Sequence, residues 1–431
     1  MECALVLLLS VLMADAGSLP DMQRRQKEGA TAPQIQPEPI RKGGKSLPGE
    51  EAQSIPVLRR AAQKGDASAQ TRLGTAYCYG QGVPQDYSEA VRWFRKAADR
   101  GYAMAQFDLG VAYDNGNGVS KDNAEATRWY RKAADQGDTR AQFNLGLAYY
   151  IGQGVPQDEA EAVRWYRKAA DQGLAEAQLN LGNAYRQGAP QDEAEAVRWY
   201  RKAADQGLAG AQLNLGLAYF TGLGAPQDYQ EAIPWFRKAA DQGDASAQFN
   251  LGNAYSYGQG VPQDEAEAVR WYRKAADQGL AEAQLNLGNA YSTGRGVPQD
   301  PAGAVRWWRK GADQGLAKAQ TNLGVAYFTG HGVPQDYEEA ITRFRKAADQ
   351  GDARAQFSLS SAYSLGRGVP VDRAEAYFWM NLAVALNTEP KNSFAEFRDD
   401  AAAKLSPGEL SATQKRCRQW MDAFEKRKAQ K

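Results

Sequence analysis

Apolar residues recur at helical spacing through most of the chain. Ala141, Leu145 and Ala148 fall at i, i+4 and i+7, which places them on one face of a helix. The pattern stops at the segment Gly152–Pro156, where glycine permits a left-handed reversal and proline cannot continue the helix. We therefore predict a first helix that ends just before residue 152.

A second amphipathic helix is predicted after this turn. Asp158 is placed as its N-cap, and Gly173 ends it in the manner of a C-cap glycine. The predicted apolar face consists of Ala162, Trp165, Tyr166 and Ala169, and the predicted solvent face of Arg164, Arg167 and Lys168. Neither helix can bury its apolar face alone, so the pair must pack against neighbouring pairs.

This pair of helices is repeated nine times along the chain. Repeats 1 to 9 start at Gly65, Gly101, Gly137, Gly173, Gly207, Gly243, Gly279, Gly315 and Gly351. The step is 36 residues, except for 34 residues in repeat 4, where the segment Tyr185–Pro190 lacks two loop residues. Because loops accept deletions that helices do not, the short repeat supports the assignment of helices and loops. We predict an all-α fold with one continuous core along the stack.

The repeat closely resembles the Sel1-like repeat, a relative of the tetratricopeptide repeat. Three blocks carry the resemblance over about residues 52–385: A-x-A-Q-x-x-L-G-x-A-Y, G-x-G-V-P-Q-D and E-A-x-x-W-[YF]-R-K-A-A. The resemblance implies a right-handed superhelical solenoid of antiparallel helix pairs. It also implies a role in protein–protein interaction, often in exported bacterial proteins.

The segments outside the repeats predict an exported, capped solenoid. Residues 1–16 resemble a signal peptide, because the apolar run Ala4–Met13 precedes Ala14-Asp15-Ala16, although no basic residue stands before the run. A mis-assigned start or a plain apolar tail is the alternative. Residues 17–50 have the composition of a disordered linker, rich in proline, glycine and charge. The location is therefore periplasmic or secreted, or cytoplasmic if the apolar run is not a functional signal.

Both ends of the repeat array differ from its middle, as solenoid caps should. Residues 51–64 are predicted to form an N-terminal half-repeat, residues 65–387 the nine repeats, and residues 388–431 the C-terminal capping helices. In the last helix Ser406 is placed as N-cap, and we expect Trp420 and Phe424, at i and i+4, to seal the open core.

Composition excludes several kinds of chemistry. The chain has 52 Lys and Arg against 51 Asp and Glu, a balance that does not suit a nucleic-acid-binding protein. His331 is the single histidine and lies in a glycine-flanked loop, and Cys3, Cys78 and Cys417 are widely separated. These residues cannot supply a four-ligand zinc site or a histidine-based catalyst. We predict no catalytic residue, metal or cofactor, no membrane span after signal cleavage, and a monomer.

A second face of the first helix is not needed for the core, and it is where we place function. In repeat 3 its positions are Arg140, Asn144, Leu147 and Ile151, spaced i, i+4, i+7 and i+11. The second position is nearly constant: Asn144, Asn180, Asn214, Asn250, Asn286 and Asn322. Helix propensity does not explain six asparagines at one position.

An asparagine amide can both donate and accept, which suits the main chain of an extended peptide. We therefore predict a concave peptide-binding surface made of these six asparagines together with Arg140, Leu147, Asn183, Leu217, Asn253, Tyr257 and Asn289. The alternative is that duplication copied the asparagines, or that they bond a neighbouring helix.

The leading function is a non-enzymatic scaffold for a protein or peptide partner. Some cysteine-rich relatives of the repeat family have been described as weak β-lactamases or penicillin binders, but they carry paired cysteines in each repeat, which this chain lacks. A cell-wall-associated periplasmic protein that recognises glycan is a third possibility, although the period of the tryptophans marks them as core residues.

Overall fold

The computed structural model describes residues 55–188, 191–387 and 394–429. Over these residues every regular element is a helix, from α3 to α23, which confirms the all-α prediction. The predicted signal peptide and linker, and the first residues of the predicted N-terminal cap, lie outside the described residues.

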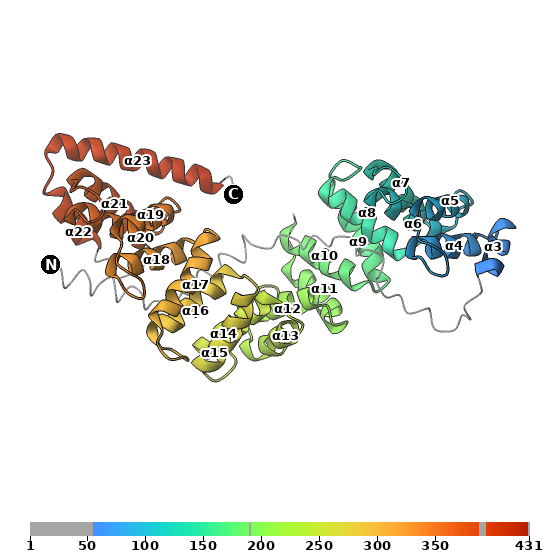
Figure 1. Ribbon diagram of the computed structural model, residues 1–431, viewed down its shortest axis with the longest axis horizontal. Coiled ribbons are helices and arrows are strands. Elements are labelled where there is room, and N and C mark those ends of the chain that lie inside the picture. Colours follow the sequence, from blue (N-terminus) through green and yellow to red (C-terminus); the bar gives the residue numbers. More distant parts are fainter. Residues whose placement is uncertain (1–54, 189–190, 388–393, 430–431) are drawn as a thin grey trace. The chain divides into compact units, whose positions relative to one another are not determined.

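The helices fall into two units, an N-terminal unit that ends at Asp228 and a C-terminal unit that begins at Tyr229 (Figure 1). The N-terminal unit contains α3 (Ile55–Gln63), α4 (Ala67–Tyr79), α5 (Tyr87–Ala98), α6 (Ala103–Asn115), α7 (Asn123–Asp135), α8 (Thr139–Ile151), α9 (Glu159–Asp171), α10 (Ala175–Gln187), α11 (Glu193–Asp205) and α12 (Ala209–Thr221). The C-terminal unit contains α13 (Tyr229–Asp241), α14 (Ala245–Tyr257), α15 (Glu265–Asp277), α16 (Ala281–Thr293), α17 (Pro301–Asp313), α18 (Ala317–Thr329), α19 (Tyr337–Ala348), α20 (Ala353–Leu365), α21 (Arg373–Leu386), α22 (Phe394–Ala402) and α23 (Pro407–Ala429).

From α3 to α12 and from α13 to α22, each helix packs on the next one along the chain, and α23 packs on α21. The two helices of one repeat, such as α8 and α9, pack as an antiparallel pair, and the second then packs on the first helix of the next repeat. The predicted solenoid of helix pairs is therefore confirmed. Within each unit, the first helices of the repeats therefore all have the same orientation.

The predicted helix ends are observed. Asp158 accepts a hydrogen bond from the Glu161 backbone N–H at 3.0 Å, as an N-cap should. Gly152 has φ 71° and its N–H donates to the Ala148 carbonyl, so it closes α8 in the left-handed conformation. One proline departs from the expectation that prolines stay outside helices: Pro234 lies inside α13, where its side chain is exposed.

Close approach of the helices explains the small residues of the repeat. A Cβ on Gly146 would lie 2.8 Å from Cδ1 of the Tyr166 ring, so only glycine lets α8 and α9 pack at this distance. Trp165 and Tyr166 are both buried and fill the space on either side. These contacts confirm the core positions expected from the period.

The cations of the second helix also contact aromatic rings. Arg131 donates to the Tyr149 hydroxyl of the next repeat, and Lys168 lies over the Trp165 ring at 3.8 Å from its centroid. The same pairs recur through both units. Arg167 and Lys168 are exposed, as predicted, and they also lie over the rings of Tyr185 and Trp165.

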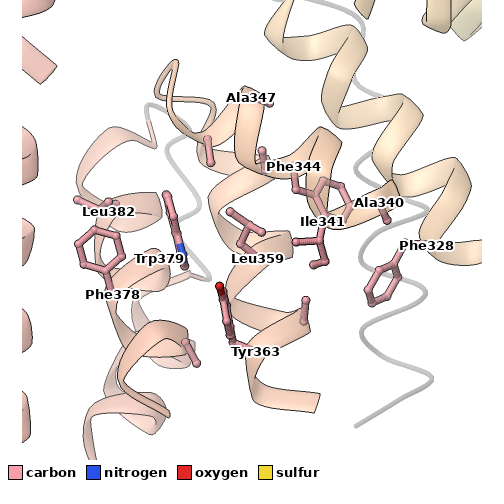
Figure 2. Packing of buried hydrophobic residues seen from close by; sticks show 14 of the residues in the cluster. Phe328, Ala340, Ile341, Phe344, Ala347, Leu359, Tyr363, Phe378, Trp379 and Leu382 are labelled. Carbon is pink, nitrogen blue, oxygen red and sulfur yellow. The ribbon is translucent and has the colours of Figure 1, made fainter. Parts of the chain in front are cut away.

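The C-terminal unit ends in a cap that closes its core. Figure 2 shows Leu359 and Tyr363 of α20 between Phe344 of α19 and Trp379 of α21. Trp420 of α23 packs against the same cluster, as predicted. The Ser406 backbone N–H donates to Glu409 Oε2 at 2.9 Å, which completes the expected N-terminal cap of α23.

Candidate functional site

The asparagine stripe, defined as Asn144, Asn180, Asn214, Asn250, Asn286 and Asn322, lies on the first helices of repeats 3 to 8. Three of its side chains are buried and three are half-buried: the buried ones are Asn180, Asn250 and Asn322. The stripe is therefore partly enclosed by neighbouring helices. It is not a row of fully solvated amides.

Three amide nitrogens of the stripe donate to an asparagine of the preceding repeat, whereas Asn250 Nδ2 donates to the Ser246 carbonyl of its own helix. Asn214 Nδ2 donates to Asn183 Oδ1 at 3.1 Å. The equivalent bond joins Asn322 Nδ2 to Asn289 Oδ1 at 2.8 Å. Asn286 bonds Asn253 in the same way. The structure thus brings together pairs of predicted site residues, and it gives the stripe a part in holding repeats together.

A second donor fixes the orientation of the accepting asparagine. Asn183 Oδ1 also accepts from the Tyr200 hydroxyl at 2.8 Å, and Asn289 Oδ1 also accepts from Trp308 Nε1 at 3.0 Å. The Trp308 indole N–H can only donate, so it identifies the bonded atom of Asn289 as oxygen, and Asn183 has the same orientation toward Tyr200 and Asn214. In the described part of the chain, the Nδ2 groups of Asn183 and Asn289 donate no hydrogen bond. Asn183 is buried and Asn289 is half-buried.

In repeats 3 and 4, where the preceding repeat has valine or leucine instead, the stripe residue bonds a tyrosine. Asn180 contacts the Tyr166 hydroxyl and Asn144 contacts the Tyr130 hydroxyl. Burial raises the pKa of both tyrosines above their ordinary value, and these asparagine bonds offset part of that rise. Asn180 Oδ1 is buried and accepts no hydrogen bond within the described residues.

The other predicted site residues are scattered over the two units. Arg140 is exposed, pairs with Asp138 at 3.1 Å and lies over the Phe107 ring. Leu147 packs beside the buried cluster that contains Phe143. Tyr257 is 40% exposed on α14.

A small pocket lies between α10, α11 and α12, with a volume of about 40 Å³. Its polar lining residues are Arg186, Glu193, Tyr200, Asn214 and Thr221, and the larger apolar ones are Val197, Leu217 and Leu223. Two predicted site residues, Asn214 and Leu217, therefore line one pocket.

Repeat 2 carries an acid at the stripe position. Burial raises the pKa of Asp108 to about 7, the nearby Arg140 charge opposes that rise, and the Asp138 carboxylate adds to it. The Asp108 carboxylate makes no hydrogen bond to any described residue. Its charge also helps to raise the pKa of Cys78, after the larger effect of burial.

Comparison with known proteins agrees with this arrangement. The sequence model of the Sel1 repeat matches nine consecutive segments: 67–102, 103–138, 139–174, 175–208, 209–244, 245–280, 281–316, 317–352 and 353–387. The chain belongs to the Sel1 repeat family. No curated protein matches this Sel1 repeat protein.

Two solved structures are similar to this Sel1 repeat protein over most of its length. A protective antigen of uropathogenic Escherichia coli with an SLR fold is 32% identical, with 88% of this chain and 97% of that chain covered and a TM-score of 0.50. A Sel1 repeat protein from Oxalobacter formigenes is 37% identical, with 72% and 90% covered and a TM-score of 0.58. This repeat scaffold is of a type that typically serves protein–protein interaction.

The described part of the Sel1 repeat protein contains no group of three or more His, Cys, Asp or Glu side chains placed to hold a metal ion. His331 is exposed in its loop, and Cys78 and Cys417 are buried free thiols. Among the same residues, no helix is long and apolar enough to cross a membrane.

Sequence reasoning missed a row of buried glutamines in the Sel1 repeats. Gln142 donates to the Ala134 carbonyl at 3.2 Å and accepts from Gln172 Nε2 at 2.8 Å. The pattern recurs at Gln178 with Gln206 and at Gln284 with Gln314. Both glutamines belong to the repeated motif, so their recurrence was the available signal. They hold successive repeats together and do not face a partner.

Proposed function

We propose that this Sel1 repeat protein is an exported, non-enzymatic scaffold that binds an extended peptide of a partner protein along its first helices. The observation that carries the proposal is the fixed amide of Asn183, repeated at Asn289. Each has its oxygen held by two donors of the protein and its nitrogen left without an internal acceptor.

Such an amide is better suited to binding a peptide backbone than a side chain that rotates freely. Its N–H groups are held in place before binding, so little side-chain entropy is lost when a carbonyl accepts them. Beside each one, the stripe residue contributes an acceptor: Asn214 and Asn322 donate through Nδ2, and their Oδ1 atoms accept no bond within the described residues. A donor next to an acceptor matches the C=O and N–H of a peptide unit.

The experiment is a selection of displayed random peptides on the full chain, followed by affinity measurement for the selected peptides. Asn183→Asp and Asn289→Asp keep the oxygen that Tyr200, Asn214, Trp308 and Asn322 bond, and they replace the free N–H donors by a second carboxylate oxygen, which also adds a negative charge. Two lost hydrogen bonds of about 1 kcal/mol each predict an affinity at least ten-fold weaker.

Two controls separate loss of binding from loss of fold. Asn183→Leu introduces the side chain that repeats 3 and 5 carry at Leu147 and Leu217, so it tests the donor without adding a charge. Tyr200→Phe removes a bond that fixes the amide but leaves its nitrogen in place, and we expect a smaller loss of affinity. Selected peptides that bind both Asp variants as tightly as the unchanged chain would refute the proposed site. Turnover of nitrocefin by the purified protein would contradict its non-enzymatic character.

A further inference from the structure

The pocket between α10, α11 and α12 differs from the rest of the stripe because it is a built hollow beside a fixed amide. Tyr200 and Asn214 both line it, and both bond Asn183 Oδ1. The pocket therefore lies next to one of the two amides that keep free N–H donors. A peptide held by Asn183 and Asn214 would pass directly over its mouth.

The lining of the pocket is suited to an uncharged apolar group. Leu217, Leu223 and Val197 are the larger apolar side chains of its lining. Arg186 and Glu193 add one positive and one negative charge, so the wall carries no net formal charge. Burying a charged side chain in such a mainly apolar hollow would cost hydration, whereas burying an aliphatic side chain is favourable.

Leu223 makes this pocket particular to repeat 5. The equivalent loop position holds a polar residue in the other repeats with a full-length loop: Gln81, Asn117, Gln153, Gln259, Arg295, His331 and Arg367. Leu223 is 41% exposed although it is a large apolar residue. Burial of this exposed leucine under another apolar group would make binding at the rim of the pocket more favourable.

The size of the pocket limits what enters it. A water-sized group needs about 10–15 Å³ of such volume, so about 40 Å³ accommodates roughly three groups of that size. The branched end of a leucine or isoleucine side chain has about this size, and an aromatic ring exceeds it. The Asn183 Nδ2 donor and the Asn214 Oδ1 acceptor are complementary to the C=O and N–H groups that flank such a side chain in an extended peptide.

We propose that this pocket is the specificity site of the scaffold and accepts one leucine- or isoleucine-type side chain of the bound peptide. The inference rests on the proposed peptide-binding function and adds to it the class of residue that the partner must present. The neighbouring amides would hold the main chain, and the pocket would set the register of the peptide.

The test uses the full chain and peptides selected from a displayed random library. The expected result is one position at which nearly all selected peptides carry leucine, isoleucine or another aliphatic residue of similar size. Replacing that residue by glycine should weaken binding at least ten-fold. A peptide with photo-leucine at that position should cross-link to residues of α11, α12 or the loop at Leu223, as read by mass spectrometry.

A matched pair of variants tests the site itself. Thr221→Tyr places over the pocket the ring that sister repeats carry at Tyr79 and Tyr257, and it should abolish the aliphatic preference. Thr329→Tyr makes the same change at the equivalent position of repeat 8, where Thr329 Oγ1 donates to the Val325 carbonyl just as Thr221 Oγ1 donates to that of Leu217. It should leave the preference unchanged.

The outcomes separate the two proposals. Peptides that bind through Asn183 but show no aliphatic position, or that cross-link elsewhere, would overturn the pocket and leave peptide binding intact. An aliphatic preference that persists in Thr221→Tyr would also overturn it. Failure to select any peptide would refute the proposed function, and this inference with it.

Discussion

The ring of Phe424 in α23 lies directly against Gly351, the glycine that follows α19 and begins repeat 9. A Cβ on Gly351 would lie 2.5 Å from Phe424 Cζ. Phe424 cannot turn away freely, because its ring stacks on Trp420 with the centroids 5.0 Å apart. The C-terminal cap therefore packs on Gly351, a position at which the contact with α23 requires a residue without a side chain.

Gly351→Ala should loosen α23. The same change at Gly315 has a matched backbone cost, because φ is 87° at Gly351 and 92° at Gly315, but a Cβ on Gly315 meets nothing within 4 Å. We expect Gly351→Ala to destabilise the cap by about 1–3 kcal/mol more than Gly315→Ala. Hydrogen exchange of α23 amides measures the difference. Equal exchange in both variants would contradict the contact, and adding Phe424→Ala to Gly351→Ala should remove most of the excess.

Much of this fold follows from the sequence because its signals are local and repeated. Asp158 as N-cap, Gly152 as helix end and Gly146 as a point of close approach depend on residues within one repeat, and nine copies average out accidents of single positions. The family resemblance then gave the stacking of the pairs.

The candidate site was less predictable because it depends on contacts between repeats. The amide of Asn183 is oriented by Tyr200 and Asn214, which lie 17 and 31 residues further along the chain. The sequence indicated asparagines on one face, but not which nitrogen would bond within the protein and which would stay available. The sequence left open whether the asparagines bind a partner or bond a neighbouring helix, and the structure shows bonds to the preceding repeat for Asn214 and Asn322.

Buried glutamines hold the repeats together through hydrogen bonds. Replacing one should reduce stability more in the middle of the repeat array than in its last repeat. Gln142 bonds both Ala134 and Gln172, whereas Gln356 bonds Ala348 and its Oε1 is buried without a partner. Gln142→Leu should destabilise its repeat by about 1–3 kcal/mol, and Gln356→Leu by less, because it also removes an unsatisfied acceptor.

Local opening energies from hydrogen exchange suit this comparison, since solenoid repeats can open separately. The amides of α7 and α8 report on Gln142, and those of α19 and α20 report on Gln356. A larger loss for the Gln356 variant would contradict the bracing role.

The two described cysteines should react slowly in the folded protein. Cys78 and Cys417 are buried, and burial raises the pKa of both thiols above the ordinary value. Iodoacetamide at pH 8, followed by mass spectrometry of each cysteine peptide, should show labelling at least ten-fold slower than in urea. Native labelling at the rate of the unfolded chain would show that these thiols are accessible.

Asp108→Asn should stabilise the N-terminal repeats at alkaline pH and change them little under acid conditions. Burial raises the pKa of Asp108 from 3.8 to about 7, so the folded state holds a proton that the unfolded state releases between these values. The stability that the neutral acid provides is complete below about pH 4 and is lost as the pH rises through 7. Asparagine, which six sister repeats carry here, never ionises.

At pH 8 the gain should be on the order of 1 kcal/mol, read as slower hydrogen exchange of α4, α6 and α8 relative to the unchanged chain at the same pH. Asp135→Asn is the control, because Asp135 is exposed at the end of α7 and should give no gain that depends on pH. The equivalent of Tyr130 in repeat 1 is Phe94, which has no hydroxyl to bond the stripe residue. Asp108 therefore lacks the hydrogen-bond partner that Asn144 has. An equal gain in stability at pH 4 and pH 8 would show that Asp108 destabilises the fold through packing and not through its charge.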